Sequence, residues 1–179
     1  MSDLLELIKS RRSCRNFTDE PVSDSSVEEF LEAARWAPSG GNIQSWFFGV
    51  IRDRKKIKEI KVVSPGLIGN PSIILALCID KDYALKKGGV LGRDVLSVAD
   101  ICMAAQNIML VAYDKGIGTC AVKSFHTVSV AKVLKLPEHI EPELLITIGY
   151  PANRSPVGKR KELDEIVFYN EWSDNNNVR

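Results

Sequence analysis

A run of seven apolar residues near the middle of the chain, Ile73 to Ile79, most constrains the fold. Successive side chains of a strand point to opposite faces, so this segment would present apolar groups on both faces. Such a strand is stable only when both faces are covered, which predicts a central strand between two layers. Leu144 to Ile148 has the same pattern and predicts a second buried strand.

Helical patterns surround these strands. Apolar residues from Val27 to Ala34 follow the helical spacing, with Ser23 or Ser25 as the N-cap. Arg93–Lys115 is apolar around most of its circumference, which predicts a buried helix or one at a subunit interface. Lys81–Gly89 is expected to be a polar, glycine-ended connection. Further helices are predicted at Leu4–Lys9, Asp53–Val63 and Val128–Leu134, and further strands at Trp46–Ile51 and Thr119–Val122. Pattern alone therefore gives a layered α/β or α+β sheet protein.

Length and composition narrow the class of protein. The 179 residues contain no repeat or linker, which predicts one domain over residues 1–179 with a frayed tail from about residue 173. A net charge of +1 gives no reason to expect nucleic acid or a membrane surface as a partner. We see no secretory pattern, no run of about 18 apolar residues and no Cys-x-x-Cys pair, and expect a reduced, cytoplasmic protein. No metal-ligand spacing and no Ser/His/Asp arrangement is visible.

Arginines that follow the first predicted helix carry the strongest chemical signal. The group consists of Arg11, Arg12, Ser13 and Arg15. Each guanidinium presents a planar fork of N–H donors that matches two phosphate oxygens at once. The cluster is a candidate phosphate site, although the same residues would also suit solvated surface charge. Cys14 lies among them, and its arginine neighbours favour the thiolate; with two histidines as the possible bases, packing is favoured over catalysis.

A second segment, from Trp36 to Gln44, changes the interpretation of the first. Together the two segments resemble the nitroreductase family of FMN-dependent oxidoreductases, in which an Arg-Arg-Ser-x-Arg-like motif precedes an Ala-Pro-Ser-x-x-Asn-x-Gln-type motif. Further matches, in the same order, lie at Ala104–Asn107, Gly116–Cys120, Gly149–Pro151 and Lys159–Lys161. The resemblance implies an α+β fold, a three-layer α/β/α sandwich with a mixed, mostly antiparallel sheet, in a dimer.

The resemblance also implies which residues would hold the flavin. The phosphate and one edge of the ring system would be bound by Arg11, Arg12, Ser13 and Arg15, and a basic cluster that reaches the same phosphate would be Lys159, Arg160 and Lys161. The loop that lies against the flavin of the other subunit would be Pro38, Ser39, Gly40, Asn42 and Gln44. The backbone that passes the reactive N5 atom would be Val122, Lys123 and Ser124. From the residues alone, the loop could be a plain helix-to-strand turn and the tail cluster exposed charge.

The implied function is that of an FMN-dependent NAD(P)H oxidoreductase. It would pass hydride from NADH or NADPH, by a ping-pong cycle, to nitroaromatics, quinones or similar flat, electron-poor small molecules. The active sites would be shared across a homodimer, and no side chain receives a catalytic role because the flavin carries the hydride. Three alternatives stay open: a divergent flavoenzyme (flavin fragmentation, dehalogenation or azoline oxidation), an FMN-binding carrier or sensor without turnover, and a flavin-free protein that binds another phosphorylated ligand.

The chain departs from the family pattern in three places. Ser45 stands where proline is common before an aromatic residue. Lys123 and Ser124 replace small, glycine-type residues, and the lysine could narrow the pocket or bind an anionic substrate. The connection between Asp80 and Arg93 leaves little room for a helical lid, which predicts a more open pocket.

Overall fold

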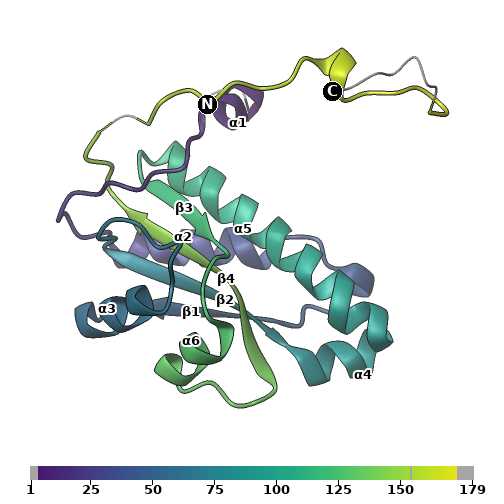
Figure 1. Ribbon diagram of the computed structural model, residues 1–179, viewed down its shortest axis with the longest axis horizontal. Helices are drawn as coiled ribbons and strands as arrows, with labels where there is room; N and C mark the ends of the chain where they lie inside the picture. The colour runs from purple at the N-terminus through teal and green to yellow at the C-terminus, as the bar shows by residue number, and fades with distance from the viewer. Residues whose placement is uncertain (1–3, 154, 173–179) are drawn as a thin grey trace.

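A four-stranded antiparallel sheet forms the centre of the protein, whose computed structural model describes residues 4–153 and 155–172 (Figure 1). The strands are β1 (Trp46–Ile51), β2 (Ile73–Asp80), β3 (Gly118–Val122) and β4 (Ile140–Gly149), in the spatial order β1-β2-β4-β3. Within the described residues, one parallel bridge, Ser13 with Thr119, adds to the antiparallel pairs. The prediction of an α+β fold with a mixed, mostly antiparallel sheet is confirmed.

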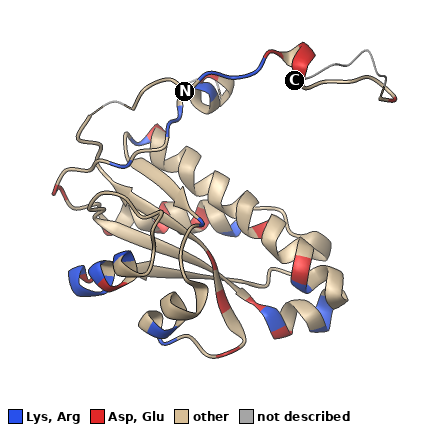
Figure 2. Cartoon of the chain, in the orientation of Figure 1, with Lys and Arg blue, Asp and Glu red and all other residues tan. Residues whose placement is uncertain are grey.

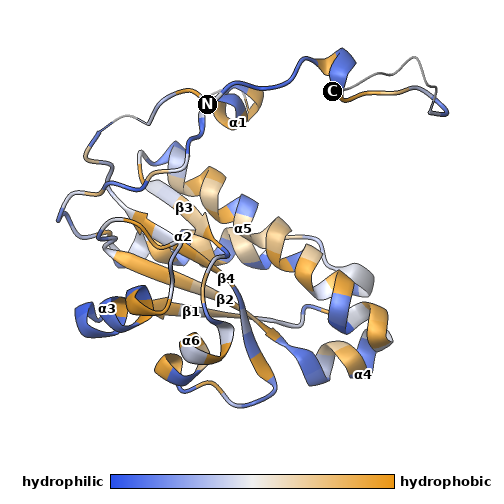
Figure 3. Ribbon diagram, viewed as in Figure 1, coloured by the Kyte–Doolittle hydropathy of each residue, from blue (hydrophilic) through white to orange (hydrophobic). Residues whose placement is uncertain are grey.

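The two central strands carry most of the buried apolar surface. Ile73 to Ile79 is buried at every position, as a strand with two apolar faces requires. Leu144 to Ile148 lies within the longer β4, which pairs with β2 on one side and β3 on the other. Figure 3 shows β2 mostly in orange, whereas β4 is orange toward its end and partly blue near its start. The prediction of two central strands is confirmed.

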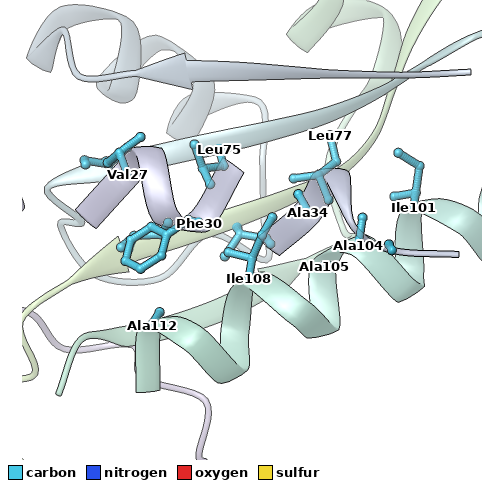
Figure 4. Packing of buried hydrophobic residues seen from close by; sticks show 14 of the residues in the cluster. Val27, Phe30, Ala34, Leu75, Leu77, Ile101, Ala104, Ala105, Ile108 and Ala112 are labelled. Carbon is cyan, nitrogen blue, oxygen red and sulfur yellow. The ribbon is translucent and has the colours of Figure 1, made fainter. Parts of the chain in front are cut away.

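One face of the sheet is covered by α2 (Asp24–Arg35) and α5 (Ser97–Asp114). Figure 4 shows Phe30 of α2 and Ile108 of α5 packed with Leu75 and Leu77 of the sheet. Ser23 is the N-cap of α2, because its side chain accepts a hydrogen bond from the backbone N–H of Ser26. This core explains much of the apolar character of the long helix.

The opposite face is covered by α3 (Arg54–Val62) and α6 (Thr127–Leu134). Ile57 and Ile60 of α3 and Val130 of α6 face Ile74 and Leu145 of the sheet. The basic residues of α3 lie on its outer side, where Figure 2 shows them in blue. The layers are therefore helix, sheet and helix, as the family resemblance implies.

The segment before α5 is helical, and the prediction of a polar connection there is wrong. It consists of α4 (Lys81–Leu91) and a π-helical segment, η2 (Gly92–Leu96). Asp80 accepts a hydrogen bond from the backbone N–H of Tyr83 at 2.8 Å and caps α4, a signal that the glycine content obscured. Gly89 has a positive φ of 62° and kinks the helix before its end.

The continuous stretch Lys81–Asp114 is long and apolar enough to cross a membrane by length and composition alone. Its α5 part, however, packs one face against α2 and the sheet. Core helices pass the same test, and the packing accounts for the apolar residues of that face.

Two segments project from the layered body. They are α1 (Leu4–Ser10) and the C-terminal segment 155–172 with its short helix η3 (Leu163–Glu165), both above the layers in Figure 1. Both carry exposed apolar side chains, which include Leu4, Leu5, Ile166, Phe168 and Trp172. The tail predicted to fray from about residue 173 lies outside the described residues.

Candidate functional site

Two paired glycines let the arginine segment cross the end of the sheet. Gly118, the first residue of β3, pairs with Gly149, the last residue of β4. A Cβ atom on Gly118 would lie 2.6 Å from the Cβ of Cys14, and one on Gly149 would lie 2.9 Å from Cδ1 of Phe17. The Cys14 N–H donates to the Thr119 carbonyl at 2.8 Å, which fixes the crossing chain. Glycine permits this close approach because it has no side chain.

Cys14 points into the protein, and the prediction of a favoured thiolate is wrong. The residue is 4% exposed, and its Sγ donates to the Asn16 carbonyl at 3.2 Å. Burial raises the pKa of the Cys14 thiol, the hydrogen bond to Asn16 opposes this, and Arg15 has a smaller opposing effect. Desolvation of the thiolate thus outweighs the neighbouring positive charge.

The arginine segment forms one wall of an open pocket of about 450 Å³. Four predicted phosphate ligands, Arg11, Arg12, Ser13 and Arg15, line it together with Arg160. The facing wall belongs to the C-terminal segment, which is fixed because Ser155 Oγ donates to the Ser13 carbonyl at 3.0 Å. Figure 2 shows basic residues on both segments. The fold therefore brings two basic regions of the sequence to one pocket.

Two arginines that line this pocket each carry one buried side-chain nitrogen without a protein partner. Arg11 Nη1 and Arg12 Nε are buried, and within residues 4–153 and 155–172 no acceptor meets them. Arg12 Nη1, by contrast, donates to the Arg11 carbonyl at 2.8 Å and to the Lys9 carbonyl, which closes the end of α1. Buried donors are nearly always paired in folded proteins. Unpaired guanidinium donors at an open pocket fit an anion with several oxygens, such as a phosphate monoester.

Sequence reasoning missed part of the pocket wall. The missed lining residues are Asn16, Asn153, Ser155, Pro156 and Gly158. Asn16 lies next to the arginine motif, and its carbonyl accepts from the Ala152 N–H at 3.0 Å. The others follow the Gly149–Pro151 match, whose position after a buried strand was the available signal. Of the predicted tail cluster, Arg160 lines the pocket, whereas Lys159 and Lys161 are exposed and lie outside its lining.

The loop after α2 is fixed to the long helix. Its short helix η1 (Gly40–Asn42) begins at Gly40, whose N–H donates to Asp100 Oδ1 at 3.0 Å. A Cβ on Gly40 would lie 2.9 Å from Cδ1 of Leu96, so the loop packs closely on the helix. Burial raises the pKa of the Asp100 carboxyl group, and the hydrogen bond from Gly40 opposes the rise. Asp100 thus links the loop to the long helix α5.

The remaining polar groups of this loop face outward or lack a partner. Pro38, Asn42 and Gln44 are exposed, and Gln44 Nε2 donates to Asn42 Oδ1 at 2.9 Å. Ser39 Oγ is buried, and the described residues give it no hydrogen-bond partner. None of the predicted loop residues lines the arginine pocket. Within one subunit, the two predicted flavin-binding regions therefore remain separate.

The third predicted region lies at the end of β3. Val122 has a buried side chain, and the Ser124 carbonyl accepts from the Gly66 N–H at 2.9 Å. Lys123 forms an ion pair with Glu143, and its Nζ also donates to the Glu143 carbonyl at 2.8 Å. Glu143 lies at a register shift between β2 and β4, and such bulges redirect side chains. The Lys123 ammonium group is thereby held by Glu143, and these residues do not line the arginine pocket.

A second, mostly apolar pocket of about 600 Å³ shares no lining residue with the arginine pocket. Its walls come from β1, β2 and the stretch from the end of α6 to the start of β4, and include Phe47, Val50, Cys78, Leu134 and Ile140. No cluster of three His, Cys, Asp or Glu side chains suited to a metal ion occurs in the described part of the chain.

Comparisons with known proteins agree with this architecture. The sequence model of the Nitroreductase family matches residues 8–64 and 64–150. The oxygen-insensitive NADPH nitroreductase of Salmonella typhimurium is 28% identical, over 96% of this chain and 75% of that protein. A candidate NADH dehydrogenase/NAD(P)H nitroreductase of Methanothermobacter thermautotrophicus is 30% identical, over 84% of this chain and 78% of that protein.

A solved structure of a related protein has a similar fold. The crystal structure of a nitroreductase family protein from Streptococcus pneumoniae superposes with a TM-score of 0.85 at 26% identity, covering 93% of this chain and 99% of that one. The family match covers both the arginine segment and the loop after α2, and the structural match covers the layered fold. The chain therefore belongs to the nitroreductase family.

Proposed function

We propose that the protein is an FMN-dependent NAD(P)H oxidoreductase that reduces nitroaromatics, quinones or similar flat, electron-poor molecules. One observation carries the proposal: Arg11, Arg12, Arg15 and Arg160 line one pocket, and Arg11 Nη1 and Arg12 Nε have no partner among the described residues. Those donors suit the phosphate of FMN. Relatives support the same chemistry, since one from Bacillus subtilis, 26% identical, is named an FMN reductase (NADPH).

The residues of this chain would bind and orient rather than react. Arg11, Arg12 and Arg15 would hold the phosphate, and Arg160 would close the pocket from the C-terminal segment. Bound FMN supplies the hydride-transfer chemistry. A positive guanidinium near the ring edge would stabilise negative charge that develops on reduction. The nicotinamide donor and the acceptor would then need only an open face of the flavin ring to bind against.

We extend the proposal to a homodimer with shared sites. Ser39 Oγ is buried and unpaired, and its loop lies outside the arginine pocket of its own subunit. The edge strand β1 exposes Phe47 and Val50 beside the apolar pocket, and the projecting segment exposes Phe168 and Trp172. A second copy would cover these surfaces and could bring the loop to the flavin of its partner. Light scattering of the FMN-loaded protein should give the mass of two chains. We also expect the protein to act in the cytoplasm.

The visible absorption spectrum of the purified protein tests the function. We expect a flavin spectrum, after reconstitution with FMN if necessary, that bleaches on anaerobic addition of NADH or NADPH. A flavin spectrum that persists with both donors would favour a carrier or a divergent flavoenzyme. A protein that stays colourless after incubation with FMN would overturn the proposal.

A further inference from the structure

Two buried thiols lie next to each other beneath the arginine pocket. Ser13 pairs with Thr119 in a parallel bridge, so the residues that follow them, Cys14 and Cys120, lie on the same face of the two neighbouring chains. Neighbouring strands are about 4.8 Å apart, which is within the roughly 4.4–6.8 Å between Cα atoms that a disulfide spans. Both cysteines are free thiols, and each is 4% exposed.

Two further observations agree with this placement of Cys14 beside Cys120. The Cβ and Sγ atoms of Cys14 lie 2.6 and 2.8 Å from where a Cβ on Gly118 would be. Gly118 and Cys120 are two residues apart on β3, so they share a face. The Cys120 thiol also raises the pKa of the Cys14 thiol, which requires the two groups to be near each other.

We propose that Cys14 and Cys120 form a redox modification site, at which a peroxide converts the two thiols into an intramolecular disulfide. Each thiol gives up one proton and one electron, and the S–S bond forms. The O–O bond of hydrogen peroxide breaks, and two water molecules leave. Thiol oxidation of this kind is reversible by a dithiol reductant.

The modification would act on the pocket above it. Cys14 Sγ now donates to the Asn16 carbonyl, and it must leave that acceptor in order to reach Cys120. Ser13, Arg15 and Asn16 all line the pocket, so the disulfide changes the part of the chain that presents the phosphate ligands. We expect affinity for FMN to fall about fivefold, the effect of losing one intramolecular hydrogen bond. This effect on FMN rests on the proposed function, whereas formation of the disulfide does not.

Occupation of the pocket should in turn protect the thiols. Both are buried, so peroxide reaches them when the segment lifts from β3 and breaks the Cys14–Thr119 hydrogen bond. An anion held by Arg11 and Arg15 keeps the segment in place. Bound FMN, or inorganic phosphate at high concentration, should therefore slow oxidation.

The other two cysteines serve as controls. Cys120 pairs with Thr147, and Thr147 pairs with Ile74, so Cys78 lies four residues further along β2 and is out of reach. Burial raises the pKa of the Cys78 thiol to about 12, and Cys78 lies on the central strand β2, so lifting of the arginine segment would not expose it. Cys102 is exposed on α5 and could link two chains. The experiment therefore uses the full chain with Cys102→Ser.

This Cys102→Ser protein is treated with hydrogen peroxide in three samples: without ligand, in the presence of FMN, and in the presence of inorganic phosphate. Its intact mass and its non-reduced peptides are followed over time. We expect a loss of about 2 Da, a peptide pair that links Cys14 to Cys120, and full reversal by dithiothreitol. FMN and phosphate should each slow the reaction, and Cys14→Ser or Cys120→Ala should abolish the link.

Several results would overturn the inference. They are a pair that stays reduced in the folded protein but oxidises after unfolding, a link that involves Cys78, and a disulfide that leaves affinity for both FMN and phosphate unchanged. A protein that binds no FMN would instead count against the proposed function. The mass measurement would still decide whether the disulfide forms, and the treatment with phosphate would still decide whether an anion in the pocket slows its formation.

Discussion

The carboxylate of Asp100 accepts a hydrogen bond from the backbone N–H of Gly40 at 3.0 Å, across 60 positions of sequence. This bond joins the loop that we expect to contact flavin to the longest helix of the core. Asp100 is 3% exposed, so water cannot easily replace it as the acceptor. The position of the loop therefore depends on one buried side chain.

Removing that carboxylate should destabilise the protein. We expect Asp100→Ala to lower the free energy of unfolding by about 1–3 kcal/mol, because the Gly40 N–H loses its buried acceptor. Asp100→Asn retains an oxygen at the same position and should retain most of the stability. Urea unfolding of both apoproteins makes the comparison. Equal losses in the two variants would mean that the Gly40 hydrogen bond contributes little.

The same residue should give a measurable pH dependence. Burial raises the pKa of folded Asp100 above its ordinary value of 3.8, so the folded state binds the proton more tightly than the unfolded state. Its contribution to stability is fully present below pH 3.8 and is lost as the pH rises through the raised pKa. The unfolding free energy of Asp100→Asn, minus that of the natural protein, should therefore increase with pH over this range. Other carboxyl groups titrate in both proteins and cancel, and a flat difference would contradict the burial effect.

A side chain at Gly118 should displace the arginine segment. In Gly118→Ala the new methyl group would lie 2.6 Å from the Cβ of Cys14, so the segment must move. We expect a loss of about 1–3 kcal/mol in stability, typical of overpacking, together with weaker FMN binding. Gly49→Ala in β1 is the matched control, since its nearest atom would be 3.6 Å away. Unchanged FMN affinity in Gly118→Ala would mean that the crossing does not position the pocket.

Sequence patterns predict the elements whose pattern of apolar residues matches their burial in the sheet. The predicted bounds of the strand Trp46–Ile51 match the structure. The predicted strand from Ile73 ends at Ile79, one residue before the observed end at Asp80. The prediction failed between Lys81 and Gly89, because a side-chain cap and tertiary packing outweighed the low helix propensity of glycine. It also failed for Cys14, because arginine neighbours in the sequence do not reveal that the thiol points inward.

The candidate site also has a part that the sequence predicts and a part that only the tertiary structure reveals. The arginine motif has a local signature, so Arg11 and Arg15 could be named from sequence. The facing wall at Asn153 and Ser155 comes from a segment without a pattern of its own, and it meets the motif through tertiary contacts such as Ser155 to Ser13. Those contacts arise because Gly118 and Gly149 leave room at the end of the sheet, which a one-dimensional pattern cannot show.

The three basic residues of the C-terminal segment should differ in importance. Arg160 lines the pocket, whereas Lys159 and Lys161 do not. We expect Arg160→Ala to weaken FMN binding by about fivefold or more, as for loss of a hydrogen bond to a charged group. Lys159→Ala and Lys161→Ala carry the same change in net charge and should have smaller effects. Fluorescence titration of the three apoproteins with FMN measures this, and equal losses would indicate a general effect of charge.

Two arginines that line the pocket, Arg11 and Arg15, allow a test that separates ligand binding from folding. Arg11→Ala with Arg15→Ala should weaken FMN binding by about tenfold or more, because charge-assisted hydrogen bonds to the phosphate are lost. Riboflavin has no phosphate, so its binding should change little. Arg11 Nη1 is buried and unpaired, so stability of the apoprotein should be unchanged or higher in Arg11→Ala. Equal loss of FMN and riboflavin binding, or a marked loss of apoprotein stability, would assign the arginines to the fold instead of the phosphate.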